Sequence, residues 1–179
     1  MRKPPIDPDQ LDYLSFVDFA VEKATRELGS VDATAMRLVL TLHRVTSALV
    51  YDLESAVHRP RGWSWAGFRV LFVLWLAGPL EAKRVAELSG MSRAAVSALL
   101  ATLERDGLID KTRAEYDRRA VQIALTDAGH AAIVDAFADH NDRERAWAGA
   151  LSAPERQILI GLLGKLMHGV NDTASRKRF

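Results

Sequence analysis

Three consecutive charged residues, Asp117, Arg118 and Arg119, separate two short segments in which apolar and polar residues alternate. These segments, 108–113 and 121–125, have the period of two that is typical of half-buried β-strands. The pattern predicts a two-stranded hairpin, here called the wing, with guanidinium groups at its tip. Such groups hydrogen-bond phosphate oxygens and base edges, so the tip has the chemistry of a nucleic-acid contact.

A second set of candidate contacts lies in the helix that we expect from Ser92 to Asp106. Its leucines and Val96 fall on one face and should pack inward, whereas the opposite face carries mostly alanine and serine. Small side chains let a helix lie deep in the major groove, where Ser97 can hydrogen-bond a base edge or a phosphate. Ser92 can cap this helix and leave other first-turn amides for a phosphate. The candidate DNA-binding residues are Ser92, Arg93, Ala94, Ser97, Ala98, Thr102, Arg113, Asp117, Arg118 and Arg119.

The segments 81–88 and 92–106 are separated by a tight turn with the sequence Ser-Gly-Met-Ser. Two helices, a turn and a basic-tipped hairpin together make a winged helix-turn-helix, a fold that reads DNA. Two local alternatives stay open: the alanine-rich face can pack against another helix, and the hairpin can be a solvated loop with a weak surface ion pair. The alternative function is a winged-helix protein-interaction module without specific DNA binding.

The segments around this module are predicted to be helices that position it. We expect them at 9–28, 32–57, 65–77 (capped by Ser64) and 126–151, with a last helix restarting near Pro154. The fold class is therefore mainly α (α+β), a winged helix-turn-helix with flanking N- and C-terminal dimerisation helices. The expected division of the chain is an N-terminal extension with one helix (1–33) and a domain (34–179), with the winged helix-turn-helix at 64–126 and dimerisation helices at 34–60 and 127–170.

The first and last helices of this domain carry apolar stripes that are wider than a thin monomeric core needs. A two-fold homodimer would bury both stripes. It would also place two reading helices about 34 Å apart, which matches a palindromic site in double-stranded DNA.

Composition limits the other classes of protein. The chain has 24 Lys and Arg against 23 Asp and Glu, a net charge of +1, so DNA binding must come from the placement of charges. Cysteine is absent, which excludes disulfides, thiolate nucleophiles and cysteine-based zinc sites. No apolar run approaches the ~18 residues that cross a membrane, and the N-terminus lacks the features of a signal peptide. We expect a cytoplasmic protein without a membrane partner.

From about Thr34 to Met167 the chain resembles the MarR family of bacterial winged helix-turn-helix transcriptional regulators. The resemblance implies an obligate dimer that usually represses nearby genes and often releases DNA when a small phenolic or anionic ligand binds. Three segments in the family's order and spacing carry the match: the helix-turn-helix at 85–109 with its exit Leu-Glu-Arg-Asp-Gly-Leu, the wing Asp117-Arg118-Arg119 closed by Leu125-Thr126, and Thr126-Asp-Ala-Gly129.

The resemblance also implies roles for single residues. Arg119 matches the wing-tip arginine that enters the minor groove, and Asp117 matches the residue that orients the tip. Arg118 and Arg113 would then contact phosphates. Many relatives carry longer polar residues where this chain has three alanines, which favours recognition through DNA shape or backbone. These alanines are Ala94, Ala95 and Ala98.

An effector site is a further hypothesis. Arg69 is the single charge in an apolar, aromatic-rich helix, and with Trp65 and the upstream His43 it could hold a small anionic or aromatic ligand. The alternative is an internal ion pair between Arg69 and Asp52 or Glu54. Arg69 stands where urate-responsive members carry an aspartate, and hydroperoxide sensors need a cysteine, so neither subgroup fits.

Catalysis is not indicated. The chain lacks a nucleophile elbow, a phosphate-binding glycine loop and the metalloprotease motif His-Glu-x-x-His. Its five histidines are spread over three helical regions without the spacing of metal ligands, and we expect them on the surface. We therefore predict that the protein is not an enzyme and has no cofactor or metal.

Overall fold

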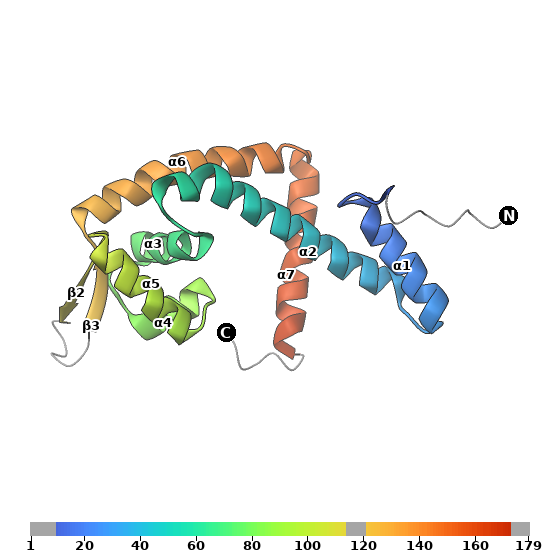
Figure 1. Cartoon of the computed structure of the whole chain (residues 1–179), viewed down its shortest axis with the longest axis horizontal. Helices are drawn as coiled ribbons and strands as arrows, with labels where there is room; N and C mark the ends of the chain where they lie inside the picture. Colours follow the sequence, from blue (N-terminus) through green and yellow to red (C-terminus); the bar gives the residue numbers. More distant parts are fainter. Residues whose placement is uncertain (1–9, 114–120, 173–179) are drawn as a thin grey trace. The chain divides into compact units, whose positions relative to one another are not determined.

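The computed structural model of the protein describes residues 10–113 and 121–172. These residues form seven α-helices, a continuation of the second helix in wider and tighter turns, and three short strands (Figure 1). The chain divides into two compact units, 1–51 and 52–179. The helices are α1 (Ser15–Leu28), α2 (Ala33–Leu53), α3 (Trp65–Ala77), α4 (Ala82–Ser89), α5 (Arg93–Arg105), α6 (Asp127–Ala148) and α7 (Ala153–Asp172).

The first unit contains α1 and most of α2. The expected start of its first helix at Asp9 is wrong, because the carboxylate of Asp12 accepts hydrogen bonds from the N–H groups of Leu14 and Ser15 at 2.9 and 2.7 Å. The helix therefore begins at Ser15. In α1 only Val17 and Val21 are buried, so this unit has little core of its own.

The second unit starts with a segment that the helical period did not predict. After α2 the chain continues as a π-helical turn, η2 (Glu54–His58), and a 3₁₀ turn, η3 (Arg59–Arg61). Gly62 ends this segment with a φ of 76°, a left-handed conformation that glycine adopts without strain. Helix α3 then begins after Ser64, whose hydroxyl accepts a hydrogen bond from the Gly67 N–H at 3.1 Å.

Helix α3 is apolar on nearly all sides because it lies at the centre of this unit, in contact with α4, α5, α6 and the sheet. In Figure 1 it lies between α6 and the pair α4–α5. The buried core around it draws on all of these elements and consists of Trp63, Phe68, Val70, Leu71, Leu74, Val85, Ala86, Val96, Leu100, Leu103, Ile109, Ile123, Ile133 and Ala136.

The sheet contains the two predicted strands, β2 (Ile109–Arg113) and β3 (Val121–Leu125), in an antiparallel pair. A third strand, β1 (Leu80–Glu81), pairs with the other edge of β3, so the order is β1-β3-β2. A two-residue strand is too short to show an alternating pattern, and β1 was therefore not predicted. Ile109 and Ile123 are buried and set which face of the sheet packs on the core.

Helix α6 begins in close contact with the end of α5. The Thr126 hydroxyl accepts a hydrogen bond from the Gly129 N–H at 2.9 Å and donates one to the Gly107 carbonyl at 2.8 Å. The Thr126 N–H donates to the Leu108 carbonyl at 3.1 Å. Among the described residues, no helix is long and apolar enough to cross a membrane.

Candidate nucleic-acid interface

Helices α4 and α5 form the predicted helix-turn-helix. Gly90 ends α4 in the left-handed region with a φ of 63°, and the next N–H returns to the Ala86 carbonyl at 3.0 Å. The expected inner face of α5 is confirmed for Val96, Leu100 and Leu103, which are buried, whereas Leu99 is only partly buried against the core. The opposite face is exposed along its whole length and carries Ser92, Arg93, Ala94, Ser97, Ala98, Ala101, Thr102 and Arg105.

The polar groups on this exposed face differ in what they can still bind. The Ser92 hydroxyl caps α5 by accepting a hydrogen bond from the Ala95 N–H at 3.2 Å, as predicted. Thr102 donates its hydroxyl to the Ala98 carbonyl at 3.3 Å, which leaves its oxygen as an acceptor. Within the described residues the Ser97 hydroxyl has no hydrogen-bond partner, so it can both donate and accept.

The wing follows the reading helix in sequence and contacts it, because β2 packs beside α5. Lys111 on β2 pairs with Glu104 near the end of α5, which connects the wing strand to the reading helix. The predicted tip residues Asp117, Arg118 and Arg119 lie outside the described residues, as does the side chain of Arg113.

Two basic residues on α4 were not predicted to belong to this surface. Lys83 and Arg84 are exposed, and Arg84 pairs with Glu87 at 2.9 Å. The hydrogen bond from Arg84 lowers the pKa of Glu87, and the charges of Lys83 and Arg93 act in the same direction. The charges of three cations therefore act on one carboxylate of α4, and one of these cations lies in the first turn of α5. The dipeptide Lys83-Arg84 is not a motif by itself, and only the fold brings it beside Arg93.

The residues proposed for an effector site are found in different surroundings. His43 belongs to the first unit, whereas Trp65 and Arg69 belong to the second. Trp65 is half-buried, and its ring stacks with the rings of His58 and Phe68 at centroid distances of 5.5 and 5.7 Å. This stacking agrees with a packing role for Trp65.

The alternative that pairs Arg69 with Asp52 or Glu54 is wrong. Both carboxylates are engaged elsewhere, and within the described residues Arg69 forms no ion pair. The Asp52 carboxylate accepts hydrogen bonds from the side chains of Arg143 and Trp147 on α6. The Glu54 carboxylate accepts one from Arg59 on η3 and one from the backbone N–H of Trp65, the first residue of α3.

The expectation that the histidines lie on the surface holds for three of them, His43, His130 and His168, which are exposed. It is wrong for His58 and His140, which are 0% and 4% exposed and lie within hydrogen-bond distance of each other. A neutral imidazole can be buried when its partner is another imidazole and aromatic rings cover its faces. No sequence pattern indicated this pair, because the two residues are 82 positions apart.

The fold and this surface define a class, the winged helix-turn-helix proteins. The sequence model of the MarR family matches residues 63–121. The chain is 32% identical over 144 residues to YwaE of Bacillus subtilis, an HTH-type transcriptional regulator, across 80% of this chain and 84% of YwaE. It is 35% identical over 140 residues to the HTH-type transcriptional regulator MgrA of Staphylococcus aureus, across 78% of this chain and 94% of MgrA. The chain therefore belongs to the MarR family of DNA-binding transcriptional regulators.

Solved structures share the fold. BpsR of Bordetella bronchiseptica, studied for the regulation of its DNA binding by 6-hydroxynicotinic acid, matches with a TM-score of 0.66 and 22% identity over 73% of this chain and 98% of BpsR. A mutant of MarR from E. coli complexed with operator DNA also matches with a TM-score of 0.66 and 22% identity, over 72% of this chain and 92% of that protein. The relatives named here are transcriptional regulators rather than enzymes.

Proposed function

We propose that the protein is a repressor that binds a palindromic site in double-stranded DNA as a homodimer and is released by a small effector. The observation that carries this proposal is the exposed face of α5, which is lined by alanines and serines and flanked by the wing and by a basic cluster. This cluster consists of Lys83, Arg84 and Arg93.

The chemistry of this face supports DNA recognition. Ala94 and Ala98 keep the helix surface flat, so the α5 backbone can approach the base edges closely, and a methyl group can touch a thymine methyl. Ser97 supplies a hydroxyl for a base or a phosphate. The basic cluster would fix the helix on the phosphate backbone, which positions the protein without reading sequence.

Homodimer formation is supported by uncovered apolar surface. On α7 seven large apolar side chains are between 37% and 69% exposed, which is unusual for a helix in water unless a partner covers it. A second copy of the chain is the simplest partner, because an isologous interface would pair this surface with itself. The side chains are Ile158, Leu159, Ile160, Leu162, Leu163, Leu166 and Met167.

Release by an effector is supported by two observations. BpsR, a structural neighbour, is regulated in its DNA binding by 6-hydroxynicotinic acid. Arg69 is half-buried in an aromatic-rich helix and forms no ion pair within the described residues, so it is a candidate to bind a carboxylate.

Isothermal titration calorimetry with salicylate as the probe tests this role. We expect binding to the wild type and a loss of at least tenfold in affinity for Arg69→Ala, about the cost of one charge-assisted hydrogen bond. Arg59→Ala removes an exposed arginine of the same unit and should bind salicylate as the wild type does. Equal heats for all three proteins would remove Arg69 from the proposal.

A footprint of the DNA upstream of the protein's own gene tests the proposed function as a whole. We expect two protected half-sites on one face of the duplex, about one helical turn apart. Addition of salicylate-like acids should reduce protection if an effector of this class acts. Absence of any protection at low salt would contradict DNA binding.

A further inference from the structure

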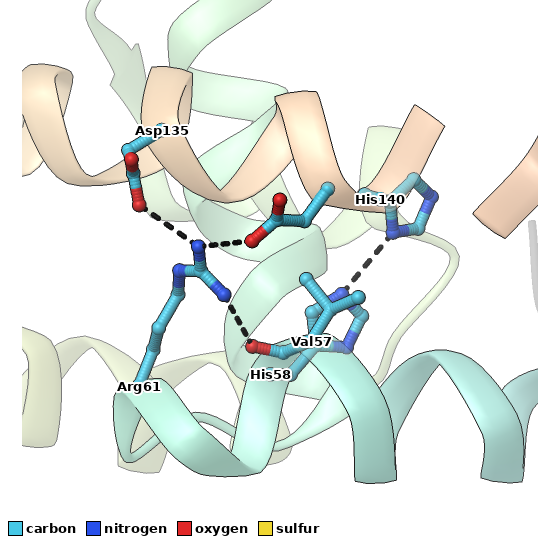
Figure 2. Close-up of polar contacts among 6 residues, drawn as sticks. Val57, His58, Arg61, Asp135 and His140 are labelled. Atoms are coloured by element: carbon cyan, nitrogen blue, oxygen red, sulfur yellow. Dashed lines mark hydrogen bonds and ion pairs between the residues drawn. The ribbon is translucent and has the colours of Figure 1, made fainter. Parts of the chain in front are cut away.

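The segment η2–η3 and helix α6 are held together by two polar contacts (Figure 2). The guanidinium group of Arg61 donates to Asp135 at 2.8 Å, to Asp139 at 2.6 Å and to the Val57 carbonyl at 3.0 Å. One turn away, the His58 Nε2 atom lies 3.2 Å from the His140 Nδ1 atom. The arginine contact is exposed to solvent on its acidic side, whereas the histidine contact is buried.

Aromatic rings enclose the histidine pair. The ring of Phe68 stacks on both imidazoles, with centroid distances of 4.3 Å to His58 and 4.5 Å to His140. Trp65 lies 5.5 Å from His58, and Phe137 lies 5.8 Å from His140. A neutral imidazole can be buried among these rings at little cost. An imidazolium would lose the water that stabilises its charge.

The contacts assign the proton positions. His140 Nε2 is 3.2 Å from the carboxylate of Glu144, so it carries the hydrogen and leaves Nδ1 as an acceptor. His58 must then donate from Nε2, which leaves its Nδ1 as a buried acceptor without a partner among the described residues. This unpartnered nitrogen is where the next proton would bind. Its N–H would find no acceptor inside the cluster.

The charged groups that face the pair come from three elements. Glu54 on η2 favours a proton on His58, whereas Arg61 on η3 opposes it, and Glu144 on α6 favours a proton on His140. From α3 the rings of Trp65 and Phe68 face the pair. Burial outweighs the carboxylates at both sites: it lowers the pKa of His58 to about 4, with the nearby His140 as the second cause, and it also lowers the pKa of His140.

Helix α6 connects this contact to the DNA-reading elements. Its first turn is fixed to the end of α5 and the start of the wing through Thr126, and its middle is fixed to η2–η3 through Asp135, Asp139 and His140. A helix is stiff over this distance, about 20 Å. A change of the contact at the middle of α6 therefore changes the orientation of its first turn against α5 and the wing.

We propose that His58, Arg61, Asp135, Asp139 and His140 form a proton-sensitive latch between η2–η3 and α6, and that protonation of the buried histidine pair opens the latch and weakens DNA binding. The proposal rests on the proposed DNA-binding function. An exposed histidine has a pKa near 6.5, so the open form takes up protons below about pH 6.5 that the closed form excludes. Acidification therefore favours the open form. At higher pH neither form takes up these protons, so the closed form is retained.

The test compares the wild type with a variant whose latch cannot titrate. In His58→Gln/His140→Asn, an amide N–H replaces the donor Nε2 and an amide oxygen replaces the acceptor Nδ1 at similar positions. His130→Gln, which removes an exposed histidine from the same helix, is the matched control. Fluorescence anisotropy measures the affinity of each protein for the footprinted upstream DNA fragment between about pH 7.5 and pH 5.5, a range that brackets the pKa of an exposed histidine.

We expect the wild type and His130→Gln to lose about tenfold in affinity over this range, and the double variant to lose less than about twofold. A constant affinity of the wild type, or an equal loss in the double variant, would overturn the latch.

A second measurement does not depend on DNA. Imidazole ¹⁵N NMR of the wild type should show two histidines as neutral Nε2–H tautomers at about pH 7.5. On acidification these two should become protonated together, at a lower pH than an exposed imidazole and over the range in which the DNA affinity falls. If none of the proteins binds the DNA fragment at about pH 7.5 but the spectrum shows these two neutral histidines, the proposed DNA-binding function is refuted and the buried histidine pair is confirmed. If His58 and His140 titrate near pH 6.5, the ordinary value of an exposed imidazole, the latch is refuted even where DNA binds.

Discussion

A single glycine decides how closely α6 can approach the end of α5. A Cβ atom at Gly129 would overlap the Leu108 carbonyl oxygen and lie 2.8 Å from its carbon, so the backbone itself occupies the space of a side chain. The same Leu108 carbonyl accepts the N–H of Thr126. The glycine in the segment Thr-Asp-Ala-Gly is therefore required by packing, which the sequence motif alone did not reveal.

Gly129→Ala tests this contact. The added methyl group meets backbone that cannot move aside, so we expect a loss of about 3 kcal/mol in the free energy of unfolding. Ala128→Ser adds one atom at the exposed neighbouring position and should change stability by less than about 0.5 kcal/mol. Urea denaturation at one fixed protein concentration measures both. A Gly129→Ala protein as stable as the wild type would show that α6 does not dock as described.

Contacts between residues close in sequence were predictable, and contacts between distant residues were not. The caps Ser64 and Ser92 are local, since a hydroxyl and an N–H three residues later meet in any helix start, and both were predicted. The burial of His58 and His140 depends on a contact across 82 residues, and the hydrogen bond between Asp52 and Arg143 spans 91. Such contacts leave no periodic signal in a single sequence.

Helix α5 has a buried apolar face and an exposed face of mostly small side chains. Ala98 lies at the middle of the exposed face, where close approach to a groove would be required. We expect Ala98→Leu to lower DNA affinity at least tenfold, because the larger side chain would hold the helix away from the base edges. The unfolding midpoint should not change, since leucine is a good helix former on an exposed face.

Ala131→Leu makes the same change on the exposed side of α6 and is the control for helix composition. Anisotropy titrations with the footprinted DNA fragment compare the two variants with the wild type. Undiminished binding by Ala98→Leu would mean that α5 does not enter a groove.

The elements themselves were largely predictable, and the exceptions have physical reasons. Helices α3 to α6 and strands β2 and β3 were predicted from the spacing of apolar residues, from capping residues and from glycines at helix ends. Their observed bounds lie close to the predicted ones. The π-helical turn η2 was not predictable, because one extra residue per turn does not disturb a short apolar pattern. The wing tip was predicted from sequence but lies outside the described residues.

The apolar side chains of α7 are uncovered in the single chain. A charge at strongly exposed apolar positions of α7 should split a homodimer, because an unpaired buried carboxylate is strongly unfavourable. We expect Ile158→Glu/Ile160→Glu to sediment as a monomer at concentrations where the wild type is a dimer, and to bind DNA at least tenfold more weakly, since a monomer contacts only one half-site. Both side chains are more than 60% exposed in the single chain, at 63% and 62%.

Gln157→Glu places the same charge on a polar position of α7 and should leave the dimer intact. Analytical ultracentrifugation of the three proteins measures the mass directly. A wild type that sediments as a monomer, or a double variant that remains a dimer, would contradict the role of α7 as a dimer interface.

Substitution of the wing arginines shows whether α5 and the wing bind duplex DNA. Binding of Arg119→Ala, Arg118→Ala and wild type to the footprinted fragment and to unrelated DNA is measured over a salt titration, with Arg145→Ala on α6 as the control. We predict that Arg119→Ala loses affinity for the specific fragment only, by about 1–3 kcal/mol. Arg118→Ala should weaken binding to both DNAs and reduce the salt slope by about 1. Wild-type affinity and salt dependence in both wing variants would show that the wing does not contact DNA.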